Sequence, residues 1–175
     1  MSRISSAAMV TAIRSAQALD MKGKEQLADE VFHAQPNLLA SVLVLPRLGV
    51  ALPKVEFALD MLFVCFLAMK ASKTTWPLIT EADQDRQLQR SVAIARFGDV
   101  LGAWLRHRSM QQYIADHPEQ ELAAYVMAET SKWLGQIAPE DSDKHVMLAI
   151  WNLVNCIGFI SITAPKAKTP RRRSR

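Results

Sequence analysis

The longest uncharged stretch of the chain covers residues 146–164, and fourteen of these nineteen residues are apolar. A helix of this composition cannot lie on a protein surface without exposing most of its apolar side chains to water. At 100° per residue it keeps a partial polar face, interrupted by Leu148 and Phe159. The members of this face are Asp141, Lys144, His145, Asn152, Asn155 and Thr163. The stretch therefore predicts a buried central helix with one edge near water or near a polar neighbour.

Amphipathic segments with helix start signals precede this stretch. Ser5 or Ser6 is suited to cap a first helix that Gly23 would end, and Thr80 with Asp83 forms a capping box. Further helices are expected over residues 24–34, 37–45, 54–71, from about 80 to 108, and from about 119 to the residue before Pro139, with a short helix or turn at 109–116. The inward-facing residues include Phe32 in the second segment and, in the long segment, Leu88, Val92, Phe97, Leu101, Trp104 and Leu105.

The length of 175 residues fits one domain with one core. Short connections between apolar-faced helices, and the lack of paired strand signals, predict an all-α fold. We expect a single-domain helical bundle of seven or eight helices around the buried C-terminal helix. A short array of stacked helical pairs is the alternative architecture.

The positive charge of the chain is concentrated at its C-terminal end. Residues 166–175 hold six Lys or Arg residues and no acid, so residues 1–165 carry fifteen basic and seventeen acidic groups. The segment has no large apolar residues and follows Pro165, a composition typical of disordered tails. We therefore expect a helical domain over 1–165 and a basic disordered tail over 166–175.

Cys65 and Cys156 fall in the two most apolar helices, where a free cysteine behaves as a small apolar residue. This usage favours a reduced, cytoplasmic protein, although a disulfide between the two helices remains geometrically possible. The N-terminal residues resemble a secretory signal only superficially, because Ser5, Ser6 and Arg14 interrupt the apolar run. An amphipathic first helix is the better interpretation.

No motif in the sequence carries catalytic or metal chemistry. Glu30 and His33 have the Glu-x-x-His spacing of carboxylate-bridged metal sites, but the second copy that such sites require is missing. Glu56 and Asp60 share one helix face, an arrangement that is usually the wet edge of a buried helix. No catalytic residue, cofactor-binding residue, cofactor or metal ligand is predicted. Catalytic groups can converge from distant positions, so the sequence leaves the enzyme question open while giving no argument for one.

Nucleic-acid binding is one alternative, with the tail supplying most of the contacts to phosphate. Arg86 and Arg90 lie one turn apart, with Arg108 near the same side. The candidate nucleic-acid contacts are Lys166, Lys168, Arg171, Arg172, Arg173, Arg175, Arg86, Arg90 and Arg108. A helix-turn-helix around Gly98 is rejected, because the apolar spacing continues through that glycine.

A membrane protein anchored through residues 146–164 is a second alternative, since the stretch has the length of a membrane span. Asn152 and Asn155 would be costly in hydrocarbon, so a membrane partner is not favoured. The expectation that the sequence supports best is a non-enzymatic, cytoplasmic helical module that binds another protein or self-associates. No resemblance to a known family enters this interpretation.

Overall fold

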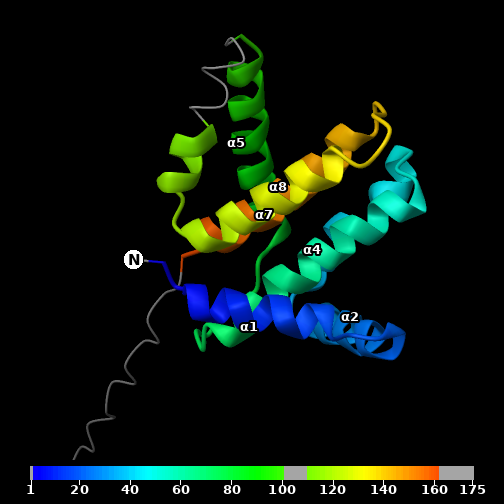
Figure 1. Cartoon of the computed structure of the whole chain (residues 1–175). Coiled ribbons are helices and arrows are strands. Elements are labelled where there is room, and N and C mark those ends of the chain that lie inside the picture. Colours follow the sequence, from blue (N-terminus) through cyan, green and yellow to red (C-terminus); the bar gives the residue numbers. More distant parts are fainter. Residues whose placement is uncertain (1, 101–109, 162–175) are drawn as a thin grey trace, which may run out of the picture.

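A computed structural model describes residues 2–100 and 110–161, with the side chains of all these residues except 93–100. Every regular element within these two ranges is a helix (Figure 1). The elements are α1 Ser6–Gln17, α2 Met21–Ala34, α3 Pro36–Leu43, the 3-10 helix η1 Leu45–Leu48, α4 Leu52–Ala71, α5 Glu81–Val100, α7 Gln120–Leu134 and α8 Asp143–Phe159, with one further helical segment at 110–115. The all-α prediction is confirmed.

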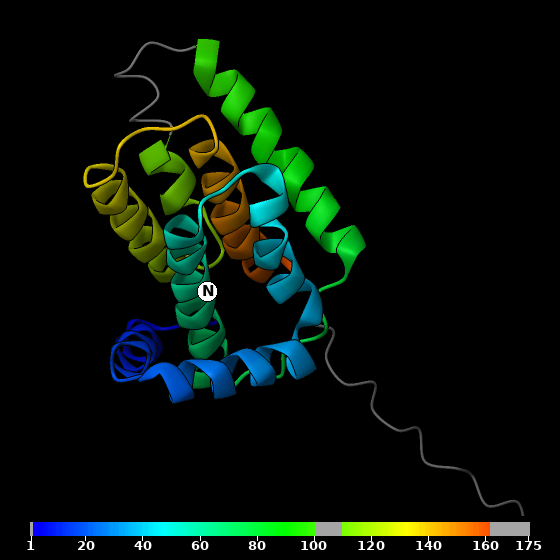
Figure 2. The same ribbon diagram turned by 90° about the vertical axis from the view of Figure 1, so that its right-hand side faces the viewer.

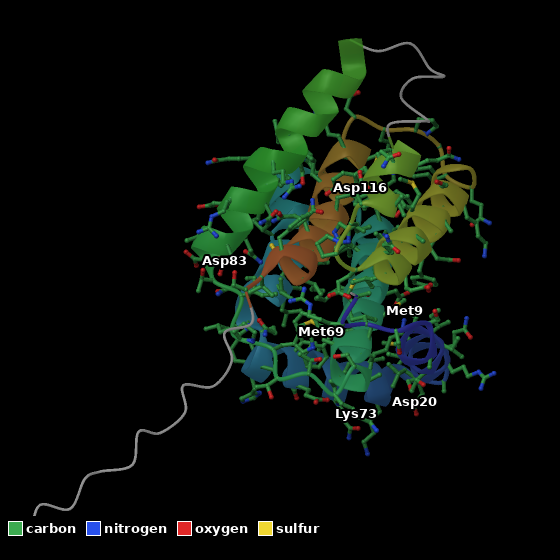
Figure 3. The ribbon with its side chains drawn as sticks, turned by 90° about the vertical axis from the view of Figure 1, so that its left-hand side faces the viewer. Met9, Asp20, Met69, Lys73, Asp83 and Asp116 are labelled. Carbon is green, nitrogen blue, oxygen red and sulfur yellow. The ribbon has the colours of Figure 1, made fainter. Side chains whose placement is uncertain are left out.

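Local capping signals set several of the helix starts. Ser5 caps α1, with its hydroxyl accepting a hydrogen bond from the Ala8 amide at 3.2 Å. In the Thr80–Asp83 capping box each side chain accepts from the other residue's amide, at 3.0 and 3.2 Å. Asp83 is labelled at the start of α5 in Figure 3. Both start signals were read correctly from the sequence.

The expected stop at Gly23 is wrong. Gly23 lies in the first turn of α2, where its amide donates to the side chain of Asp20 at 2.7 Å. Asp20 is therefore the N-cap, and the chain breaks between α1 and α2 at residues 18–20. A glycine near a helix end can belong to either helix, and here the capping carboxylate decides which one.

The centre of the molecule is shared by α4 and α8. In Figure 2, α8 lies between α5 on one side and α4 with α7 on the other. α4 packs against α1, α2, α3, α7 and α8, and its Ala58, Leu62 and Cys65 have no exposed surface. The prediction of a buried C-terminal helix is confirmed, but α4 has at least as central a place.

α8 ends at Phe159, five residues before the predicted end at Ala164, and residues 162–164 lie outside the described part. Its interior side is made by Val146, Ile150, Leu153 and Ile157. Asn152 and Asn155 on the predicted polar face are also buried. At Asn155 the partial polar face therefore lies against polar neighbours, which agrees with the predicted helix edge near water or near a polar neighbour.

Two side chains expected to point inward are exposed. Phe32 is 59% exposed because α2 packs through Leu27 and Val31 on an adjacent sector. Leu88 is 37% exposed because α5 turns Gln87 and Ser91 toward α8 instead. A pattern that weights only apolar residues misplaces a helix whose buried side is partly polar. The side chains of Phe97, Leu101, Trp104 and Leu105 lie outside the described residues.

α7 closes one side of the core. Leu122 and Val126 are fully buried, and the half-buried Trp133 stacks on Phe57 of α4 with ring centroids 4.5 Å apart.

Among the described residues, none of the helices combines the length and the apolar character needed to cross a membrane.

Candidate functional site

The predicted nucleic-acid residues are only partly described. The six tail residues and Arg108 lie outside the described residues, whereas Arg86 and Arg90 lie one turn apart on α5. Arg86 is 3.4 Å from the carboxylate of Asp83, and the Arg90 guanidinium lies over the Phe159 ring at 3.9 Å. Residues 81–90 contain three acids and two arginines, so this part of α5 carries no net positive charge.

The carboxylates considered for metal or acid–base chemistry have other partners. Glu30 forms an ion pair with Lys70 at 2.6 Å, and the His33 ring is bonded to the backbone carbonyl of Asp29. Asp60 forms an ion pair with Lys24 at 2.6 Å. Among the side chains that the structure describes, those of residues 2–92 and 110–161, no group of three His, Cys, Asp or Glu could hold a metal ion.

Cys65 and Cys156 are both buried free thiols, so the disulfide alternative is wrong. Burial raises the pKa of each thiol to about 12. A thiol with such a pKa is protonated at neutral pH and is a poor nucleophile. Both cysteines act as apolar packing residues in this fold.

Four of the large apolar side chains that are exposed among the described residues lie in the turn that links α3, η1 and α4, residues 43–53. Leu43, Val44, Leu48 and Leu52 are 54%, 40%, 48% and 69% exposed. The single charged residue of the turn is Arg47. We call residues 43–53 the apolar turn.

The apolar turn is held in place from within. Leu45 and Val50 are buried, and the Val50 amide donates to the Leu45 carbonyl at 3.2 Å. Gly49 between them has a φ of 81°, a backbone conformation that favours glycine. The exposed side chains are therefore presented on a short, internally hydrogen-bonded loop.

A cavity of about 260 Å³ lies between α5, the helical segment 110–115 and α8. Most of its wall is apolar and comes from Met110, Met147, Leu148 and Trp151. Its polar lining residues are Ser91, Tyr113, Asn155 and Lys144. The five lining residues of α8 recur at positions i, i+3, i+4, i+7 and i+11, which places them on one face of the helix. We call this space the α8 cavity.

A chain of hydrogen bonds closes one end of the α8 cavity. The Tyr113 hydroxyl donates to the Asn155 amide oxygen. The Asn155 amide nitrogen donates to the Ser91 hydroxyl at 2.9 Å, and Ser91 donates to the Gln87 carbonyl at 3.0 Å. Asn155 is 1% exposed, so these bonds satisfy a polar group that would otherwise be costly inside the core.

His117 is buried beside this network. Its Nδ1 accepts a hydrogen bond from the Glu119 amide at 3.1 Å, so the proton of the neutral ring lies on Nε2. Nε2 is buried without a hydrogen-bond partner among the described residues. Burial lowers the pKa of His117, and the nearby positive charge of Arg90 lowers it further. The neutral ring lies against Gly158, where a Cβ would be 2.5 Å from His117 Cε1.

Two buried ion pairs among the described residues hold elements together. Arg3 binds the fully buried Glu119 and also donates to the carbonyls of Ile157 and Gly158 at the end of α8. Lys54 of α4 binds Asp143 and, at 3.0 Å, Glu140. Burial alone would lower the pKa of Lys54, but the hydrogen bonds to Asp143 and Glu140 outweigh the effect of burial and raise the pKa of Lys54. The bond from Lys54 lowers the pKa of Asp143.

Sequence reasoning missed most of these sites. The helices predicted over 37–45 and 54–71 leave the apolar turn as a connection, although its eleven residues with one charge are visible in the sequence. Leu148 interrupts the polar face of α8 in the sequence pattern, and Lys144, Leu148 and Asn155 of this face border the α8 cavity. Arg3 and Glu119 had no sequence signal that paired them, since they are 116 residues apart. Comparison of the chain with models of known protein families, with curated proteins and with solved structures finds no match.

Proposed function

We propose that this chain is a non-enzymatic helical module that binds another protein through the apolar turn. The observation that carries the proposal is the exposure of four large aliphatic side chains within ten residues, at Leu43, Val44, Leu48 and Leu52. Single exposed apolar residues are ordinary, whereas a contiguous exposed apolar surface marks an interaction site. Burial of these side chains by a partner supplies the hydrophobic driving force of association.

The charge of the apolar turn favours a different protein over a second copy of the chain. A two-fold contact centred on the turn would bring Arg47 of both copies to the same interface, where the like charges repel. A partner that presents apolar side chains together with an acidic group opposite Arg47 avoids this repulsion. The internal bonds of the turn support such binding, because little backbone order has to be gained on association.

The proposal is tested with the double variant Leu48→Asp/Leu52→Asp, and Leu88→Asp on α5 is the matched control at another exposed leucine. A photo-crosslinking residue is placed at position 48 and, separately, at position 88 in the native cell. We expect one protein to be crosslinked from position 48 and not from 88, and to co-purify with the native chain and with Leu88→Asp. The double variant should lose this protein while keeping its circular dichroism melting curve.

Two results would overturn the proposal. One is recovery of the same protein by the double variant in native amounts. The other is a crosslink from position 48 to a second copy of the chain alone, accompanied by a dimeric mass in light scattering; this result would replace a different partner with self-association.

A further inference from the structure

The α8 cavity is independent of the apolar turn and lies between other elements. Its walls combine an apolar surface with one charged side chain, Lys144, among the described residues that line it. Lys144 forms no ion pair with any other described residue. A cation beside an apolar cavity is suited to a ligand that is apolar over most of its length and anionic at one end.

The polar groups at one end of the cavity do not need hydrogen bonds from a ligand. The Tyr113 hydroxyl proton is donated to Asn155, and the Ser91 hydroxyl proton is donated to the Gln87 carbonyl. Asn155 itself is occupied on both sides by these two hydroxyls. Since these groups already bind one another, an apolar ligand atom beside them leaves no hydroxyl proton unpaired.

The lining of α8 gives the cavity a direction. Lys144 and Asn155 are eleven residues apart on one helix face, which corresponds to roughly 16 Å along the helix axis. Met147, Leu148 and Trp151 occupy the length between them. An elongated ligand can therefore place its anionic end near Lys144 and its apolar body against these three side chains.

The volume limits the size of the ligand. An engineered apolar cavity of about 150 Å³ binds benzene, so a cavity of 260 Å³ has room for roughly ten non-hydrogen atoms. This is the size of octanoate. The two lining methionines, Met110 and Met147, have flexible thioether side chains that adapt to a chain of this kind.

We propose that the α8 cavity binds a small amphipathic carboxylate, a straight-chain acid of about the size of octanoate, with the carboxylate at Lys144. The ligand class follows from three observations: the apolar wall, the cation at one end and the satisfied polar groups at the other. Binding would add apolar contacts to a half-buried face of α8, so the bound form has a higher melting temperature than the free form.

The test uses the full chain and three probes of equal chain length: octanoate, 1-octanol and octylammonium, each below its micelle-forming concentration. Binding is measured by isothermal titration calorimetry. We expect saturable binding of octanoate, weaker binding of 1-octanol and no detectable binding of octylammonium. Lys144→Gln should weaken octanoate about two- to fivefold, toward the affinity of 1-octanol, because the lysine is exposed and its ion pair is screened. The control Lys132→Gln, at an exposed lysine of α7, should leave all three affinities unchanged.

A second measurement places the ligand without relying on a variant. With methyl-labelled methionine, octanoate should shift the Met110 and Met147 signals and leave Met9 and Met69 in place. Met9 and Met69 lie on α1 and α4, and Figure 3 shows them away from the helical segment that ends near Asp116. Leu148→Trp, which fills the cavity, should abolish binding of both octanoate and 1-octanol.

The proposal is overturned if octanoate shows no saturable binding, or if octylammonium binds as tightly as octanoate. It is equally overturned if the shifted methionine signals are those of Met9 and Met69, because the ligand would then occupy another part of the molecule. If 1-octanol binds the native chain as tightly as octanoate does, and Lys144→Gln weakens neither, the ligand class would not require a carboxylate.

Discussion

The Arg3 guanidinium lies 2.5 Å from the carboxylate of Glu119, and this contact joins two residues that are 116 positions apart in the chain. The same carboxylate accepts hydrogen bonds from the Ser2 hydroxyl and from the backbone amides of Arg3 and Ile4. The guanidinium also donates to carbonyls at the C-terminal end of α8, which carries the negative end of the helix dipole. One side chain thus fastens the first residues to both α7 and α8.

Replacing Arg3 by methionine should destabilise the protein strongly. Glu119 would remain fully buried without its cation, and breaking a buried ion pair by removing one partner costs about 3 kcal/mol or more. For a chain of this length we expect the melting temperature to fall by roughly 10 °C. Arg14→Met, at an exposed arginine of α1, is the matched control and should change the melting temperature little. Equal melting curves for the two variants would contradict a structural role of the Arg3–Glu119 pair.

Gly158→Ala should be destabilising although alanine favours helices. The added Cβ would lie 2.5 Å from Cε1 and 2.8 Å from Nε2 of His117, whose side chain is buried, so the ring or the helix would have to shift. We expect a loss of about 1 to 3 kcal/mol from overpacking, which exceeds the gain in helix propensity. Chemical denaturation measures the effect. Gly135→Ala, where the nearest atom to an added Cβ is 3.4 Å away, should cause no loss, and His117→Ala should rescue Gly158→Ala.

The free energy of unfolding should decrease as the pH falls below about 6.5. Burial lowers the pKa of His117 in the folded protein, while the unfolded chain titrates near the ordinary value of about 6.5. Around and below that pH the unfolded state binds more protons than the folded state, so protonation favours unfolding. A single group changes the free energy by at most about 1.4 kcal/mol per pH unit.

Urea denaturation between pH 7 and pH 5 measures this dependence. His117→Gln should flatten the profile, whereas His33→Gln, at an exposed histidine, should leave it as in the native chain. A profile that stays unchanged in His117→Gln would assign the dependence to another group.

Ile157→Asp should prevent stable folding, because Ile157 has no exposed surface and a buried unpaired carboxylate is among the most destabilising changes. Trp151→Ala should be milder than the 3 to 5 kcal/mol typical of a fully buried aromatic residue. Trp151 is half-buried and borders the α8 cavity, so its removal enlarges an existing space. Expression level and melting temperature of the two variants give the comparison. A larger loss for Trp151→Ala than for Ile157→Asp would contradict this ranking.

Deleting residues 165–175 should leave the melting temperature nearly unchanged and abolish salt-sensitive binding to duplex DNA. The deleted segment carries six basic residues, and the remaining chain has two more acidic than basic groups. Arg86 and Arg90 supply only two positive charges, and Arg86 lies 3.4 Å from the carboxylate of Asp83. Fluorescence anisotropy with labelled DNA tests the prediction at physiological salt. Sub-micromolar binding by the truncated chain, lost on Arg86→Glu/Arg90→Glu, would favour a nucleic-acid function instead.

The sequence by itself determined the fold class and most helix starts. The high apolar content of residues 54–71 and 146–159 requires burial on several sides, and this requirement does not depend on which helix supplies the partner surface. The caps at Ser5 and Thr80 act within four residues, so their chemistry is complete in the local sequence. For the same reason the buried state of Cys65 and Cys156 could be predicted from their apolar surroundings.

Only the tertiary structure decided which polar residues face inward. Ser91 lies on the buried side of α5, where the Asn155 side chain of α8 donates to its hydroxyl. Tyr113 of the segment 110–115 completes this network by donating to Asn155. Arg3 is tied to Glu119 because the fold brings the first residues beside the start of α7. Most buried polar side chains have a hydrogen-bond partner, and where that partner comes from another element its position is a property of the packed structure, not of the local sequence.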